Sequence, residues 1–164
     1  MTIHFGADGT SLSSGNIGGG KVVKYSYDTD TTHRTYSNSW ADTGLDMTFT
    51  PASSSSRLII TAFYNLFASP VQATNTTTWG KFWQRIQVAG STVAEEQKCS
   101  AGLGHSGYYS HYAAWKQWQF TFQVVYENGN TSAKNIKAQL KEESGVLELN
   151  KENGLSYITV LEVE

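Results

Sequence analysis

A segment rich in aromatic and histidine residues, residues 102–115, is the part of the sequence best suited to contact a ligand. It reads Gly-Leu-Gly-His-Ser-Gly-Tyr-Tyr-Ser-His-Tyr-Ala-Ala-Trp. Tyrosine and tryptophan rings offer flat apolar faces with a polar tip, on which a sugar ring can stack. Binding residues often lie on long loops, but the same side chains are also typical of protein interfaces. A second polar segment, residues 69–80, contains Trp79 near its end. We therefore expect either ligand contacts or packing contacts from Trp79, His105, Tyr108, Tyr109, His111, Tyr112 and Trp115.

Other reactive residues do not have the spacing that catalysis or metal binding requires. His105 and His111 have no Asp, Glu or Cys between them, and their spacing fits no standard zinc site. Asp28-Thr29-Asp30 resembles the start of a calcium loop but lacks its glycine and closing glutamate. The sequence has no Gly-x-Ser-x-Gly elbow and no phosphate loop. We therefore expect no metal, no cofactor and no enzymatic activity.

Composition excludes several classes of partner. The formal net charge is −2 and only 16% of the residues are charged, so nothing favours nucleic acid or an anionic membrane. No apolar stretch approaches the roughly 20 residues of a membrane helix, and the N-terminus has no apolar signal-like segment. The single cysteine, Cys99, cannot form an intrachain disulfide, and we expect it to be inert.

The elements that must position these residues are predicted to be β-strands. After residue 20, short segments alternate apolar and polar residues and are separated by turn residues, at a spacing that indicates eight to ten strands. Asn128-Gly129 is a hairpin signal. This pattern predicts an all-β antiparallel β-sandwich, for which we prefer the jelly-roll type. The expected inward residues include Leu45, Met47, Phe49, Phe82, Ile86, Val88, Trp118, Phe120, Phe122, Val124, Tyr126, Ile136, Ala138 and Leu140.

Two segments, residues 57–68 and 155–163, are apolar on both faces of the predicted strand. In the first, Leu58, Ile60, Ala62, Tyr64 and Leu66 share one face. A strand covered on one face alternates apolar and polar residues, whereas a strand covered on both faces does not. One core in a chain of this size covers one face of a sheet, so a second copy is expected to cover the other. The expected oligomer contacts are Ile59, Phe63, Phe67, Ile158 and Val160.

Two parts of the chain are expected to differ in organisation. Residues 1–20 are rich in glycine and serine, end in three glycines and contain few apolar residues, which predicts a flexible attachment arm. Residues 21–164 are expected to form one β-sandwich domain.

Several motifs resemble those of C-terminal domains of bacteriophage tail-fibre and other virion structural proteins. Phe5-Gly6-Ala7-Asp8-Gly9-Thr10 is similar to their short N-terminal lead. Thr43-Gly44-Leu45 is followed by a strand ending in Thr50-Pro51, a serine run and Arg57-Leu58-Ile59-Ile60, in the order that these proteins have. The final residues, 156–163, resemble their closing strand. The resemblance covers the two ends of the chain, and residues 69–116 depart from it.

This resemblance implies a jelly-roll head similar to the tumour-necrosis-factor-like trimers. Its partners would be two further copies of the chain, other virion proteins through residues 1–20, and a host-surface receptor, with a glycan as one candidate. The expected location is the virion exterior, at a fibre or spike. Two alternatives stay open: a purely structural decoration or connector protein of the virion, and a monomeric carbohydrate-binding module. A glycan-degrading enzyme is the least favoured reading.

Overall fold

The computed structural model describes residues 21–164 except residues 70–71, 74–75, 78–79, 101–115 and 145. Within these ranges the regular secondary structure is almost entirely β-strand, and the one helical turn is far too short to cross a membrane. The elements are β1 (Val22–Asp30), β2 (Arg34–Tyr36), β3 (Ala41–Phe49), β4 (Arg57–Ser69), β5 (Gln72–Ala73), β6 (Thr76–Thr77), β7 (Gly80–Val88), β8 (Ser91–Ser100), β9 (Lys116–Glu127), β10 (Lys134–Ser144), β11 (Val146–Leu149), η1 (Lys151–Asn153) and β12 (Ser156–Val163).

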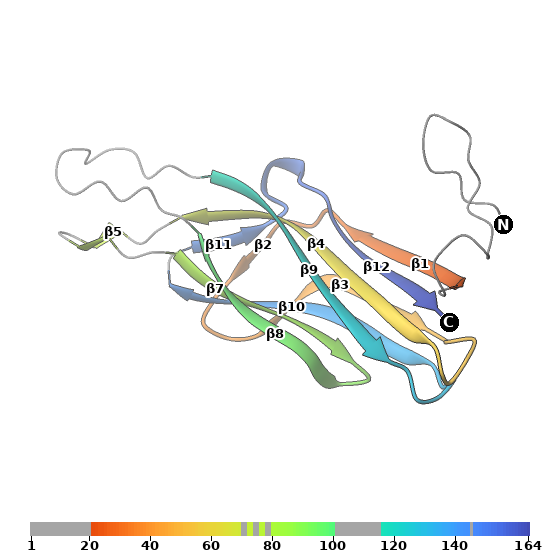
Figure 1. Cartoon of the computed structure of the whole chain (residues 1–164). Helices are drawn as coiled ribbons and strands as arrows, with labels where there is room; N and C mark the ends of the chain where they lie inside the picture. Colours follow the sequence, from red (N-terminus) through yellow and green to blue (C-terminus); the bar gives the residue numbers. More distant parts are fainter. Residues whose placement is uncertain (1–20, 70–71, 74–75, 78–79, 101–115, 145) are drawn as a thin grey trace.

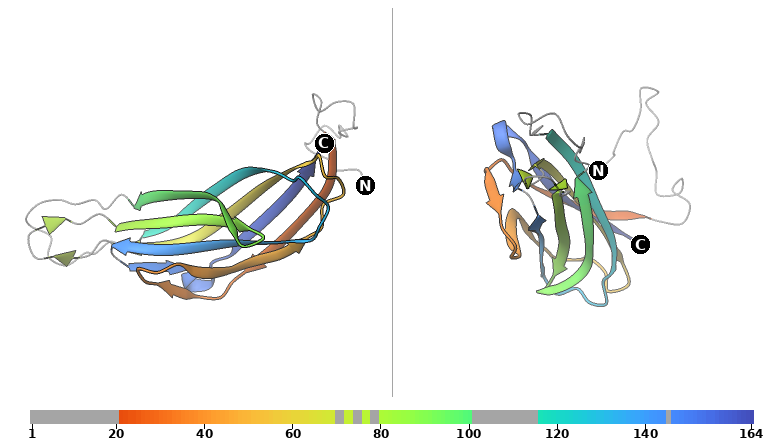
Figure 2. Two further views of the ribbon diagram at one scale, coloured as in Figure 1. Left: turned by 90° about the horizontal axis from the view of Figure 1, so that it is seen from below. Right: turned by 90° about the vertical axis from the view of Figure 1, so that its left-hand side faces the viewer.

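Two antiparallel sheets stack as two layers of an elongated domain (Figure 1, Figure 2). In the first sheet the long strand β4 is central. One edge of β4 pairs with β9. Along the other edge, β12 pairs with the first part of β4 and β11 with its last part. Strand β1 pairs in turn with β12, and β2 pairs with β11. The second sheet has the order β3-β10-β7-β8. The prediction of an all-β antiparallel sandwich is therefore confirmed.

The core lies between the two sheets and is made by one face of each. All five residues predicted for one face of β4 are fully buried: Leu58, Ile60, Ala62, Tyr64 and Leu66. The second sheet contributes the fully or almost fully buried side chains of Leu45, Phe49, Phe82, Ile86, Val88, Ile136, Ala138 and Leu140, as the alternation of the sequence predicts. Met47, Phe120, Val124 and Tyr126 are partly buried and pack against this core. Trp118 lies on β9, outside the described side chains.

The Asn128-Gly129 turn is not a hairpin, which corrects the prediction made from the sequence. The two strands that it joins, β9 and β10, lie in different sheets, so the turn crosses the sandwich. The buried Asn128 amide donates to the Ser53 carbonyl oxygen at 2.5 Å, and its backbone N–H donates to the Ser56 carbonyl oxygen at 3.1 Å. These bonds tie the turn to the loop between β3 and β4 instead of to a partner strand. A tight hairpin joins β7 to β8 at Ala89-Gly90, where both residues have positive φ.

The domain has two distinct ends. At one end, Lys21 and Glu164 exchange backbone hydrogen bonds of 2.8 and 2.9 Å, so the described chain starts and finishes side by side. The β3–β4 loop and the β9–β10 turn lie at this end too (Figure 1). The end of β4, the start of β7, the end of β8 and the start of β9 lie at the other end, where Gly80 pairs with Ser100 and Ala68 with Lys116.

Candidate interaction surface

The residues predicted to contact a ligand lie outside the described residues. These are Trp79, His105, Tyr108, Tyr109, His111, Tyr112 and Trp115. The strands that lead into and out of their segments are described, and all of them end far from Lys21 and Glu164 (Figure 2). Ligand contacts by these side chains therefore stay a prediction.

The outward face of the β9-β4-β12-β1 sheet contains three of the five large hydrophobic residues that are exposed in the described part of the chain. Antiparallel pairing aligns its side chains in three rows of four, because directly opposed residues point to the same side of a sheet. None of these twelve side chains is charged, and we refer to these three rows as the uncharged outward face. The next row, at its edge, contains the exposed ion pair of Arg57 and Glu127. The rows are Tyr25, Leu161, Ile59 and Val125; Tyr27, Thr159, Thr61 and Gln123; and Thr29, Tyr157, Phe63 and Thr121.

Several large side chains on this face are open to solvent in the single chain. Tyr25, Tyr27 and Val125 are 52%, 63% and 55% exposed. Tyr25 and Tyr27 stack at 6.1 Å between ring centroids and form one side of an open groove of about 540 Å³. Its lining residues are Tyr25, Tyr27, Thr29, Thr61, Tyr157 and Thr159. An uncharged, aromatic and partly exposed sheet face has the features of a protein-contact surface.

The predicted oligomer contacts divide between this face and the interior. Ile59 and Phe63 lie on the outward face and are half-buried. Ile158 and Val160 are fully buried in the core, so their assignment to an interface is wrong. Phe67 is 6% exposed beneath the chain's own Lys151, whose Nζ lies 5.5 Å from the ring centroid, and it is therefore unavailable as well.

The error on β12 has a physical reason. Both faces of this strand are apolar, so its alternation does not tell which face is inward. The inward face also contains Ser156 and Glu162, whose polar groups are hydrogen-bonded inside the protein. Alternation along the sequence does not indicate that Tyr157, Thr159 and Leu161 face outward, or that they lie beside Tyr25 and Tyr27.

The outward face of the second sheet is different, since it is polar and charged. Arg85 Nε donates to Gln139 Oε1 at 2.7 Å, Gln139 donates to Asp42, and Lys137 Nζ lies 3.2 Å from Asp42 Oδ2. Two tryptophans, Trp40 and Trp83, lie among these groups and are contacted by cations. The two sheets thus present different surfaces. The first has the three uncharged rows with one ion pair, Arg57–Glu127, at their edge, and the second has charged groups across its outward face.

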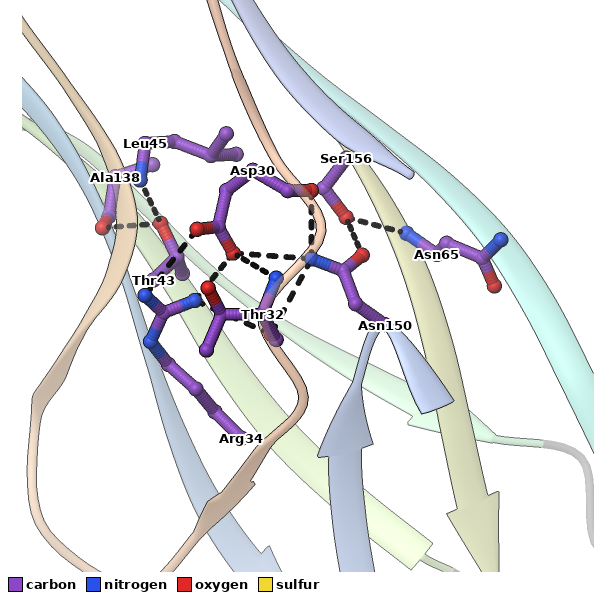
Figure 3. Close-up of polar contacts among 9 residues, drawn as sticks. All are labelled: Asp30, Thr32, Arg34, Thr43, Leu45, Asn65, Ala138, Asn150 and Ser156. Carbon is purple, nitrogen blue, oxygen red and sulfur yellow. Dashed lines mark hydrogen bonds and ion pairs between the residues drawn. The ribbon is translucent and has the colours of Figure 1, made fainter. Parts of the chain in front are cut away.

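A polar cluster near the ends of β1 and β11 is structural (Figure 3). Asn150, in the left-handed conformation, donates through Nδ2 to the Asp30 carbonyl oxygen at 2.8 Å, and its Oδ1 accepts from Ser156 Oγ at 2.7 Å. Arg34 is hydrogen-bonded to the Asp30 carboxylate. Burial opposes ionisation of Asp30, but hydrogen bonds from Arg34 and Thr32 lower its pKa overall. The donors and acceptors of this cluster bond to one another, which is typical of a structural contact between strands.

A fully buried carboxylate, Glu162, fixes the opposite end of the domain. Glu162 is fully buried and accepts hydrogen bonds from Ser56 Oγ at 2.6 Å and from the backbone N–H groups of Ala52 and Ser53 at 2.8 and 3.1 Å. Burial raises the pKa of a carboxyl group, but here the hydrogen bonds outweigh it, and the pKa of Glu162 lies below its ordinary value. Glu162 therefore holds the β3–β4 loop against β12. Within the described residues, no group of three or more His, Cys, Asp or Glu side chains could hold a metal ion.

Comparison with known proteins gives no family for the chain. No family model matches, and no curated protein matches. Solved structures with a related arrangement include dimeric latent PorU from Porphyromonas gingivalis, at 11% identity and a TM-score of 0.41, over 87% of this chain and 13% of that one. They also include T=1 particles derived from infectious bursal virus and the Gx strain of infectious bursal disease virus. The identities are 12% and 14% and the TM-scores 0.36 and 0.35, over 87% of this chain and 39% and 40% of those. The chain spans well under half the length of these proteins, and likenesses with such TM-scores support no argument about function.

Proposed function

We infer that this chain is the head domain of a bacteriophage tail fibre or spike, that it has no enzymatic activity, and that it associates with itself as a trimer. Its role is to present loops to a receptor on the host surface, on the exterior of the virion. The observation that carries self-association is the uncharged outward face of the β9-β4-β12-β1 sheet. The phage assignment and the number three rest on the sequence resemblance, because an apolar face requires a partner surface but does not set a symmetry.

Burial of the outward face would stabilise an oligomer through the hydrophobic effect. Apolar surface removed from water contributes about 25 cal/mol per Å². Tyr25, Tyr27 and Val125 are more than half exposed in the single chain, so contact with a second copy would remove much of their surface from water. The charged outward face of the second sheet has its own ion pairs and would remain in solvent.

The positions of the two ends support the receptor-binding part of the proposal. The arm of residues 1–20 precedes Lys21, and Lys21 lies beside Glu164 at one end of the domain. Attachment through this arm would direct the opposite end away from the particle. The segments that contain the predicted ligand contacts connect strands at that opposite end.

The strand order supports the jelly-roll type. Among the eight long strands, the first sheet has the order β1-β12-β4-β9 and the second β3-β10-β7-β8. The chain changes sheet at each connection between these strands except the β7–β8 hairpin. An eight-stranded jelly roll, an architecture found in viral capsid and lectin domains, would have such an order, which supports the proposed type.

Light scattering on the purified chain tests the association. The wild-type chain is expected to have a mass of about 54 kDa, three times 18.0 kDa. Val125→Glu places a charge on the outward face of the first sheet at an exposed position, so the single chain should fold but remain monomeric. Thr48→Glu is the matched control, because Thr48 is an exposed strand residue on the second sheet. A monomeric wild type, or equal masses for all three proteins, would overturn the proposal.

A further inference from the structure

Two tryptophans and a lysine form a row across the outward face of the second sheet. Lys141 Nζ lies 5.2 Å from the ring centroid of Trp40 and 5.3 Å from that of Trp83. Arg85 Cζ lies 4.2 Å from the Trp40 ring. Cations at these distances are attracted to the negative faces of the indoles and hold the side chains in place. Both indoles are nevertheless only half-buried, so part of each remains available to a ligand.

Hydrogen-bonding groups lie at the edge of this row. Trp83 Nε1 donates to Glu143 Oε2 at 2.5 Å, and the Gln97 amide donates to the same oxygen. Glu143 and Gln97 are exposed. The hydrogen bonds from Trp83 and Gln97 lower the pKa of Glu143, which is therefore a carboxylate at neutral pH. An exposed carboxylate in a fixed position can accept hydrogen bonds from the hydroxyl groups of a ligand.

Charges around the row are balanced. Four cations, Lys81, Arg85, Lys137 and Lys141, are accompanied by four carboxylates, Asp42, Asp46, Glu95 and Glu143, on the same face. A balanced surface does not favour a polyanion, which binds where positive charge is in excess. Flat indole surfaces beside fixed donors and acceptors instead suit an uncharged ring that carries many hydroxyl groups.

We propose that the row of Trp40, Lys141 and Trp83, together with Glu143 and Gln97, is a binding site for a neutral glycan. The indoles stack on sugar rings, while Glu143 and Gln97 contact sugar hydroxyls. The side chains are already held by one another, which reduces the entropy lost on binding. The role of this site in receptor binding rests on the proposed function. The site lies on the sheet opposite the association face and so stays open in the oligomer.

The alternative is that the cation–π contacts cover two surface tryptophans that bind no ligand. Binding measurements distinguish a glycan site from this purely structural role. The probes are neutral oligosaccharides built from glucose, galactose, mannose and N-acetylglucosamine, with sialylated and uronic-acid oligosaccharides for comparison. The full chain is titrated with each, and binding is followed by calorimetry and by tryptophan fluorescence. At least one neutral oligosaccharide is expected to bind. Binding of none, or of acidic oligosaccharides alone, would overturn the proposal.

Variants locate the site. Trp83→Ala and Trp40→Ala are each expected to weaken binding at least tenfold, and Glu143→Gln several-fold. Trp83→Phe keeps an aromatic face but cannot donate to Glu143, so its loss should be smaller than that of Trp83→Ala. Thr35→Ala, at an exposed position on the edge strand β2 of the other sheet, should leave affinity unchanged. Thermal melting checks that each variant is folded. Unchanged affinity in folded Trp40→Ala and Trp83→Ala would overturn the assignment of the site.

Failure of this site and failure of the proposed association give different results. A trimer that binds no neutral oligosaccharide would support the proposed association and overturn the proposed site. A monomer that binds a neutral oligosaccharide, with loss of binding in Trp83→Ala, would support the proposed site and overturn the proposed association.

Discussion

Phe63 and Tyr157 lie directly opposite each other on β4 and β12, with their rings stacked at 4.8 Å between centroids and 10° between planes. The pair occupies the two middle strands of the third row of the uncharged outward face, and Tyr157 also lines the groove. A cross-strand aromatic pair stabilises the sheet that carries it. In the proposed oligomer the same pair would also be covered by a second copy, which makes it a good place to test folding and association separately.

Phe63→Asp is expected to abolish association and to lower the free energy of unfolding of the single chain by about 1–2 kcal/mol, because it removes the stacked pair. Light scattering measures the first effect and urea denaturation the second. Thr48→Asp, an equivalent change on the other sheet, should alter neither the mass nor, by more than about 0.5 kcal/mol, the stability. An oligomer of unchanged mass in the Phe63 variant would count against the interface.

Glu162→Gln is expected to destabilise the chain by about 2–3 kcal/mol, because one carboxylate oxygen would become an NH₂ group facing backbone N–H donors. The change removes a buried acceptor of bonds from Ala52, Ser53 and Ser56. The matched control is Glu127→Gln, since Glu127 forms an exposed ion pair with Arg57 and should contribute less than about 1 kcal/mol. Urea denaturation compares the two. Equal stabilities would show that Glu162 does not hold the loop.

Stability is expected to fall in acid. Glu162 and Asp30 have folded-state pKa values below their ordinary values of 4.5 and 3.8. Such carboxylates stabilise the folded state above the unfolded-state pKa, and this contribution is lost as pH falls through the folded-state pKa. The urea midpoint should therefore be level near neutral pH and decline below about pH 4.5. In Glu162→Gln the decline should be shallower, and an identical slope would exclude Glu162 as a source.

Gly44→Ala is expected to destabilise the chain more than Gly129→Ala. Both glycines have positive φ, at 83° and 62°, so both substitutions strain the backbone, by about 1 kcal/mol. A Cβ at residue 44 would also lie 2.8 Å from Arg34 Cζ and push the guanidinium away from Asp30, whereas a Cβ at residue 129 would meet open space. The difference in free energy of unfolding between the two variants measures this displacement. A larger loss at residue 129 would contradict it.

Alternation along the sequence was enough to predict the strands and most of the core. Residues such as Phe82, Ile86, Ile136 and Leu140 alternate with polar neighbours, and burial of one face of a strand requires that pattern. The same rule placed Leu58 to Leu66 inward on β4. Since β4 and β12 both have two apolar faces, the rule allows either orientation for each, and the predicted orientation is right on β4 but wrong for Ile158 and Val160 on β12.

Long-range pairing decided what the sequence by itself could not. The Asn128-Gly129 turn has the local chemistry of a hairpin, but β4 takes β9 as its partner and β10 lies between β3 and β7, so the turn crosses between sheets. The uncharged outward face joins residues from four strands that are distant in sequence, such as Tyr25, Ile59, Val125 and Leu161. Trp40 and Trp83 meet at Lys141 for the same reason. Local residue types determine which strands form, whereas the surfaces with which this protein can bind depend on which strands become neighbours.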